Sequence, residues 1–122
     1  MSQKILLAED DNDMRRFLVK ALEKAGYKVI SYDNGASAYD RLREEPFSLL
    51  LTDIVMPEMD GPTLLGEIRK LYPDMKFIFV SGFAEDAFAR NLPEGSKFGF
   101  LPKPFSLKQL ATTVREMLDK PG

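Results

Sequence analysis

The hydrophobic residues of this chain form short apolar runs that alternate with longer amphipathic stretches, five times over. A run of about four to eight apolar residues between turn formers is typical of a strand buried on both faces. These runs predict five strands, over residues 4–8, 27–31, 48–53, 76–80 and 97–101. In the stretches between them, apolar residues recur roughly every three or four positions, which predicts helices.

Five helices are expected, one after each strand. They are the segment from Asn12 or Asp13 to Gly26, the segment from Asn34-Gly35 to about Glu44, the segment from Pro62 through Leu71, a short segment at about 84–91, and a last segment through Leu107 and Leu118. Asn12 or Asp13 is the expected cap of the first helix, and Gly26 suits the left-handed conformation that follows a last turn. The last helix should bury a stripe of Leu107, Leu110, Val114, Met117 and Leu118.

Alternation of strands and helices, with nearly continuous apolar strands, favours an α/β fold in which helices cover both faces of a parallel sheet. Pro102 fits best if the fifth strand lies at an edge, because proline cannot donate a hydrogen bond within a central ladder. A doubly wound, flavodoxin-like sheet with strand order 2-1-3-4-5 satisfies this, although periodicity does not determine the order. Residues 1–122 are expected to form a single domain.

The composition of the chain excludes several classes of function. The formal net charge of -2 offers no basic excess for nucleic acid. The chain has no cysteine and no histidine, which excludes disulfides, thiolate or imidazole metal ligands and a histidine base. No apolar run approaches the roughly 18 residues of a membrane span, and the first residues lack a signal-peptide pattern. We therefore expect a cytoplasmic protein that binds neither membrane nor nucleic acid.

Polar residues that carry chemistry follow four of the predicted strands. In an open parallel sheet, ligands bind beyond the carboxyl ends of the strands. The side chains expected at this rim are Glu9, Asp10 and Asp11 after the first strand, Asp53 after the third, Ser81 after the fourth and Lys103 after the fifth. Each residue alone would be explained as a cap, a turn former or a surface charge. Their convergence on one rim indicates a functional site.

The residue types at this rim suit phosphoryl transfer. Asp10 and Asp53, with Glu9 beside them, offer hard oxygen ligands for a small divalent cation such as Mg²⁺. The Asp53 carboxylate can act as a nucleophile and form an acyl phosphate. Lys103 would neutralise the phosphoryl oxygens, and the Ser81 hydroxyl would donate to one of them. Such transfer needs positioning and charge neutralisation more than proton chemistry, so the lack of histidine is no obstacle.

Four ordered motifs span the chain: L-L-A-E-D-D-N-D-M-R-R (6–16), L-L-L-T-D-I-V-M-P-E-M-D-G (49–61), V-S-G (80–82) and F-L-P-K-P-F (100–105). Together they resemble the CheY-type receiver domains of bacterial response regulators. The resemblance implies a two-component signalling protein with five strands in the order 2-1-3-4-5 and five helices. It also implies a phosphorelay receiver, and the chain is too short for an added output domain.

The resemblance assigns the metal site residue by residue. Asp53 matches the phosphoacceptor, and Glu9 and Asp10 match the acidic pair, with Asp10 the more direct ligand. Val55 matches the position whose backbone carbonyl binds Mg²⁺. Asp11 falls outside the pair and is expected to be a cap or a surface charge.

The resemblance also assigns a switch. Ser81 matches the hydroxyl that approaches the phosphoryl group, and Phe100 matches an aromatic side chain that turns inward on activation. Lys103 matches the active-site lysine, and the Lys103-Pro104 bond matches one that is cis in the family.

A receiver of this kind takes its phosphoryl group from a phosphohistidine of a histidine kinase or of a histidine phosphotransferase. We expect that partner to contact Met14 and Arg15 on the first helix and Pro104 and Phe105 after the fifth strand. Met14 and Phe105 could equally be packing residues.

The two halves of the chain resemble different members of the family. Residues 4–61 are similar to stand-alone receivers of the CpdR type, which act with an adaptor of the ClpXP protease. Residues 62–120 are similar to the receivers of CckA-type cell-cycle kinases. Both types are served by a ChpT-like phosphotransferase. An engineered hybrid joined near Gly61 and a natural protein would each explain this, and a ClpXP adaptor role stays open.

Two other functions compete. A phosphatase of the haloacid-dehalogenase type places its aspartate nucleophile after the first strand and a second aspartate two residues later, whereas Asp53 follows the third strand and Val55 is two residues on. A metal-free interaction module is opposed by the intact set of Asp10, Asp53, Ser81 and Lys103. We therefore expect a signalling receiver that assists its own phosphorylation and dephosphorylation, rather than an enzyme.

Overall fold

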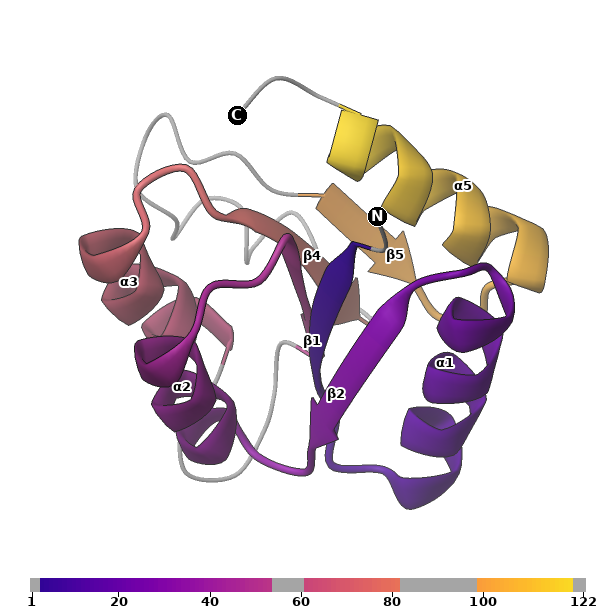
Figure 1. Ribbon diagram of the computed structural model, residues 1–122. Helices are drawn as coiled ribbons and strands as arrows, with labels where there is room; N and C mark the ends of the chain where they lie inside the picture. The colour runs from indigo at the N-terminus through magenta and orange to yellow at the C-terminus, as the bar shows by residue number, and fades with distance from the viewer. Residues whose placement is uncertain (1–2, 54–60, 82–98, 120–122) are drawn as a thin grey trace.

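The computed structural model describes residues 3–53, 61–81 and 99–119 (Figure 1). The strands are β1 (Lys4–Ala8), β2 (Lys28–Tyr32), β3 (Leu49–Asp53), β4 (Lys76–Ser81) and β5 (Gly99–Pro102). The helices are α1 (Asn12–Lys24), α2 (Gly35–Glu44), α3 (Gly61–Leu71) and α5 (Leu107–Asp119). The helix predicted at 84–91 lies outside the described residues.

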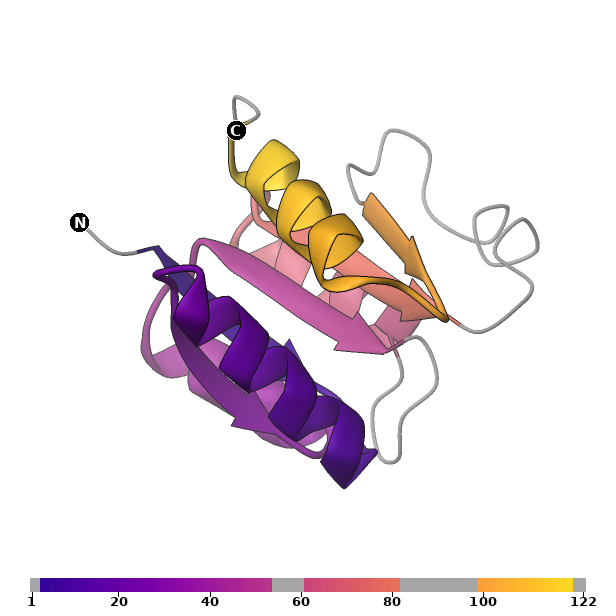
Figure 2. The same cartoon turned by 90° about the vertical axis from the view of Figure 1, so that its right-hand side faces the viewer.

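The strands form one parallel sheet in the order β2-β1-β3-β4-β5. This confirms the predicted α/β fold and strand order, which is the order found in CheY. Helices α2 and α3 cover one face of the sheet, and α1 and α5 cover the other (Figure 1). Figure 2 looks onto the second face, where α1 and α5 lie in front of the sheet and run roughly along its strands. Because β5 is at an edge, Pro102 costs the sheet no central hydrogen bond.

Side chains of the central strands alternate between two hydrophobic clusters. Leu6 and Leu50 point into the cluster under α2 and α3. Leu7 and Leu51 point into the cluster under α1 and α5. Both faces are buried, so a strand of this sheet is apolar at consecutive positions, as the sequence pattern required.

The ends of α1 differ in part from expectation. The cap is Asp11, and neither Asn12 nor Asp13, because the Asp11 backbone is extended and its side chain accepts hydrogen bonds from the amides of Asp13 and Met14. Gly26 takes a φ of 100°, which confirms its predicted role after the last turn.

The predicted stripe of α5 is wrong at its first residue. Leu110, Val114 and Met117 are buried, whereas Leu107 is 58% exposed. Leu107 begins the helix, where the chain has just left the edge of the sheet.

Within the described residues, no helix has the length and apolar character needed to cross a membrane.

Candidate functional site

Three acidic residues meet at the carboxyl edge of the sheet. Glu9 and Asp10 follow β1, and Asp53 ends the neighbouring strand β3. The register pairs Ala8 with Thr52, so the residues that follow them, Glu9 and Asp53, lie side by side at this edge. One carboxylate oxygen from each of Glu9, Asp10 and Asp53 lies within 4.8 Å of the others. The structure thus brings together the three acids that the sequence singled out.

Glu9 is buried although its side chain is ionisable. Only 1% of its surface is exposed, and its backbone amide donates to the Tyr32 carbonyl at 3.0 Å. Its Oε2 accepts a hydrogen bond from the Asp11 amide at 3.1 Å. Among the described residues, its Oε1 has no hydrogen-bond partner. A buried polar atom without a hydrogen bond is costly, so Oε1 is a good candidate for a bound cation.

Burial also changes the protonation of Glu9. Desolvation raises the pKa of its carboxyl from 4.5 to about 7, and the nearby charge of Asp53 adds to the rise. The Asp11 amide and the Lys103 charge oppose that rise only in part. Without a metal, burial therefore keeps this carboxyl protonated well above the pH at which an exposed glutamate ionises.

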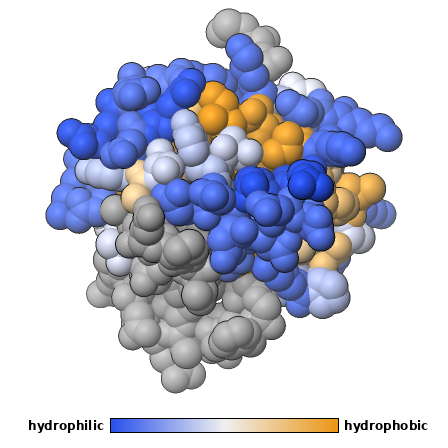
Figure 3. Space-filling model, turned by 90° about the horizontal axis from the view of Figure 1, so that it is seen from below, coloured by the Kyte–Doolittle hydropathy of each residue, from blue (hydrophilic) through white to orange (hydrophobic). Residues whose placement is uncertain are grey.

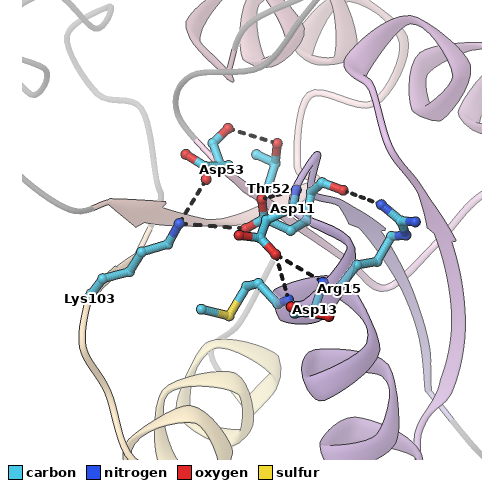
Figure 4. A network of polar contacts seen from close by, with 8 residues as sticks. Asp11, Asp13, Arg15, Thr52, Asp53 and Lys103 are labelled. Carbon is cyan, nitrogen blue, oxygen red and sulfur yellow. Dashed lines mark hydrogen bonds and ion pairs between the residues drawn. The ribbon is translucent and has the colours of Figure 1, made fainter.

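Lys103 supplies a positive charge to this edge. Its Nζ donates to Oδ2 of Asp53 at 3.0 Å and lies 3.7 Å from Oε1 of Glu9 (Figure 4). Partial burial alone would lower the pKa of Lys103, but the hydrogen bond and charge of Asp53, with the charge of Glu9, outweigh it and raise the pKa. One ammonium group cannot balance three carboxylates, so the ionised site retains negative charge that favours a cation.

The turn between β1 and α1 is held by side chains of its own helix. Asp11 Oδ1 accepts from the amides of Asp13 at 2.9 Å and Met14 at 3.0 Å. Arg15 reaches back, and its Nη1 donates to the Glu9 carbonyl at 2.9 Å (Figure 4). The turn that carries the acidic pair is therefore tied to the first turn of α1.

Three predicted site residues cannot be followed to their side chains. Val55 lies outside the described residues. Ser81 ends β4 and Phe100 lies within β5, but their side chains are not among the described ones. Their backbones do lie in adjacent parallel strands, with Phe79 paired to Phe100.

The expected partner contacts lie on the α1 and α5 side. Met14 and Phe105 are half-buried and pack against the hydrophobic cluster under these helices, so packing is part of what both do. The Phe105 ring also lies 6.2 Å from that of Phe17, which is 38% exposed. Pro104 is exposed, and the Lys103-Pro104 bond is cis, as the resemblance implied.

Figure 3 views the molecule from below the sheet as drawn in Figure 1, at the end where the strand arrows point. The described residues there are mostly hydrophilic, with small hydrophobic patches between them.

Thr52 is one residue of the site that sequence reasoning missed. It is fully buried, and its Oγ1 donates to the backbone carbonyl of Asp53 at 3.0 Å (Figure 4). The sequence did contain a signal for Thr52, because it is a polar residue that follows three leucines and directly precedes Asp53. Arg15 was expected only as a contact for a partner, and its bond to Glu9 had no sequence signal.

Comparison with known proteins identifies the family. The response regulator receiver domain model matches residues 5–115. The chain is 59% identical over 121 residues to the sensor kinase CckA of Brucella abortus. This alignment covers 98% of the chain but only 13% of the kinase. It is also 59% identical over 116 residues to the response regulator receiver protein CpdR of Brucella abortus, covering 95% of this chain and 97% of CpdR.

A solved structure supports the assignment. The crystal structure of the receiver domain from the hybrid histidine kinase CckA matches with a TM-score of 0.80 and 31% identity, over 95% of this chain and 99% of that one. The likeness to both CpdR and CckA is thus confirmed. The equal identities do not separate residues 4–61 from residues 62–120, so a hybrid origin stays a prediction. Because the family model covers residues 5–115 and CpdR matches almost from end to end, the chain belongs to the response regulator receiver domain family.

Proposed function

We propose that this receiver accepts a phosphoryl group on Asp53 in a phosphorelay. The observation that carries the proposal is the position of the Asp53 carboxylate, 3.0 Å from the Lys103 ammonium and beside Glu9 and Asp10. An Asp53 oxygen would attack the phosphorus of a phosphohistidine, forming an O–P bond as the N–P bond breaks and the imidazole leaves. Lys103 would neutralise charge on the transferred oxygens, which is the main requirement of such a transfer.

We further propose that Glu9, Asp10 and Asp53 hold Mg²⁺, with the Val55 carbonyl as the fourth ligand that the resemblance implies. The donor set fits, because three carboxylate oxygens are hard ligands and lie within 4.8 Å of one another. Glu9 Oε1, buried and without a hydrogen-bond partner among the described residues, supports the same conclusion. When bound, Mg²⁺ supplies additional positive charge for the phosphoryl oxygens.

Labelling with acetyl phosphate and Mg²⁺, followed by intact mass measurement, tests the phosphoacceptor. We expect one added phosphate on the unaltered chain and none on Asp53→Ala. Asp40→Ala is the matched control, since Asp40 is an exposed aspartate on α2, and it should label as the parent does. Undiminished labelling of Asp53→Ala would refute the assignment.

The metal role has its own test. Chelation with EDTA should abolish labelling, and Asp10→Ala should lose both Mg²⁺ binding and labelling. An unchanged labelling rate in EDTA would show that the proposed metal is not used.

We propose that the phosphodonor is a histidine kinase or a ChpT-like histidine phosphotransferase that contacts Met14, Arg15, Pro104 and Phe105. Support comes from the partial exposure of Met14 and Phe105 close to the acidic edge. The double variant Met14→Ala and Phe105→Ala should slow transfer from such a partner and retain labelling by acetyl phosphate. Because both residues also pack, a thermal melt must show that the variant is folded. Equal transfer rates for variant and parent would exclude this contact.

The remaining parts of the function are extensions of the same proposal. Movement of Ser81 and Phe100 after phosphorylation would change the surface of β4, β5 and α5, and a structure with beryllofluoride tests it. A receiver that only assists its own phosphorylation and dephosphorylation should not turn over unrelated phosphate monoesters. A cytoplasmic location and a ClpXP adaptor role stay predictions.

A further inference from the structure

We propose that Arg15 is a positioning residue that holds the turn carrying Glu9 and Asp10 in the geometry that binds the metal. This inference rests on the proposed metal site. The Arg15 side chain starts in the first turn of α1 and runs back toward the end of β1. Its Nη1 donates to the Glu9 carbonyl at 2.9 Å and its Nη2 donates to Asn12 Oδ1 at 2.5 Å. One planar guanidinium therefore joins the start of the turn to the start of the helix.

The hydrogen bonds of Arg15 are part of a network that surrounds this turn. The Glu9 amide is tied to the Tyr32 carbonyl on β2 at 3.0 Å, and Glu9 Oε2 accepts from the Asp11 amide at 3.1 Å. The Arg15 amide donates to the Asp11 carbonyl at 2.9 Å, as the first turn of α1 requires. The backbone on both sides of Asp10 is thus held by hydrogen bonds, and the Arg15 side chain ties Glu9 to the helix.

Electrostatics explains why this turn needs a restraint. Glu9, Asp10 and Asp53 repel one another when ionised, and opening the turn would relieve that repulsion. The Asp10 side chain is exposed, so packing does little to fix it. Residues that orient metal ligands through such bonds typically change metal affinity by about 10–100-fold when removed.

The charge of Arg15 should affect Mg²⁺ affinity in the opposite direction to its positioning role. The two effects can therefore be separated. A nearby guanidinium repels a divalent cation, so loss of the charge alone would tighten Mg²⁺ binding. Loss of positioning would weaken it. The sign of the change in affinity therefore shows which effect dominates.

Arg16 provides a matched control. It is the next residue on α1 and carries the same charge, but its side chain is exposed and lies 4.0 Å from the exposed Asp13. Calorimetric titration of the full chain with Mg²⁺, without phosphodonor, should show about tenfold weaker binding for Arg15→Ala. Arg16→Ala should bind within about twofold of the parent, since it leaves the turn intact. Arg15→Lys, which can bond the Glu9 carbonyl but lacks the guanidinium fork, should be intermediate.

Two further measurements separate positioning from a general loss of structure. In metal-free protein, hydrogen exchange at the Asp11 amide should become faster in Arg15→Ala and stay unchanged in Arg16→Ala. With acetyl phosphate, the Mg²⁺ concentration for half-maximal labelling should rise about tenfold in Arg15→Ala, while the rate at saturating Mg²⁺ stays within about twofold. If Arg15→Ala does not fold, Arg15→Lys and Asn12→Ala, which removes the second bond of the guanidinium, take its place in all three measurements.

The inference is overturned if Arg15→Ala binds Mg²⁺ as tightly as the parent or more tightly, or if Arg16→Ala shows the same loss. Failure of the underlying function looks different, because the unaltered chain would then fail to bind Mg²⁺ or to label at Asp53.

Discussion

Replacing Glu9 with glutamine should stabilise the metal-free protein at alkaline pH and have almost no effect near pH 4. Glutamine keeps the shape of the side chain and an oxygen that can accept from the Asp11 amide, but it removes the charge that is buried when Glu9 ionises. Only 1% of the Glu9 surface is exposed, so solvent does little to screen that charge. The variant therefore isolates the cost of holding this carboxylate in the folded chain.

The magnitude follows from the pKa of Glu9, which burial raises from 4.5 to about 7. Below the lower value, folded and unfolded chains are both protonated and Glu9 has no effect on stability. Between the two values, the folded chain keeps a proton that the unfolded chain releases, so raising the pH favours unfolding. Each pKa unit corresponds to about 1.4 kcal/mol, which gives a cost of about 3 kcal/mol once the pH exceeds the folded value.

Urea unfolding in EDTA at a series of pH values measures this directly. The free energy of unfolding of Glu9→Gln minus that of the parent should grow from near zero at about pH 4 to about 3 kcal/mol at about pH 8. Glu23→Gln, at an exposed position on α1, is the control and should show no such growth. A difference for Glu9→Gln that is constant from pH 4 to 8 would refute the reasoning. Added Mg²⁺ should stabilise the parent more than the variant, because only the parent retains all three carboxylates.

Three substitutions test other parts of the structure by thermal or urea unfolding. Asp11→Ala should cost about 1 kcal/mol, because it removes the cap of α1, and an unchanged stability would show that the cap is not used. Gly66→Ala should stabilise by about 0.5–1 kcal/mol, since no described atom lies within 4 Å of the added carbon in the helix, and destabilisation would contradict this. Leu50→Ala should cost about 2–5 kcal/mol in the core of β3, and a cost below about 1 kcal/mol would contradict its burial.

The sequence by itself determined the fold class. Its nearly continuous apolar runs favoured strands buried on both faces, and Pro102 fitted best with the last strand at an edge; the structure confirms both. The acids after β1 and β3 were also predictable as neighbours, because the carboxyl ends of parallel strands share one edge of a sheet. Periodicity did not give the strand order, which the resemblance supplied.

The tertiary structure decided how the residues of the edge interact. Asp11, Asn12 and Asp13 are all residue types that favour the N-cap position. Asp11 is the cap because its backbone is extended and its side chain accepts from the amides of the first turn. Leu107 has the correct spacing for the core, but its place at the start of α5 leaves it exposed.

The individual side-chain contacts at this edge had no local signal, even where the residues were expected to meet. Lys103 reaches Asp53 across 50 residues of sequence, and the burial that raises the pKa of Glu9 comes from elements that meet only in the folded chain. Arg15 turns back to Glu9, although its position in the sequence is equally compatible with a side chain in solvent. Sequence spacing fixes which residues come to one edge, but side-chain direction, desolvation and charge balance depend on neighbours brought together by folding.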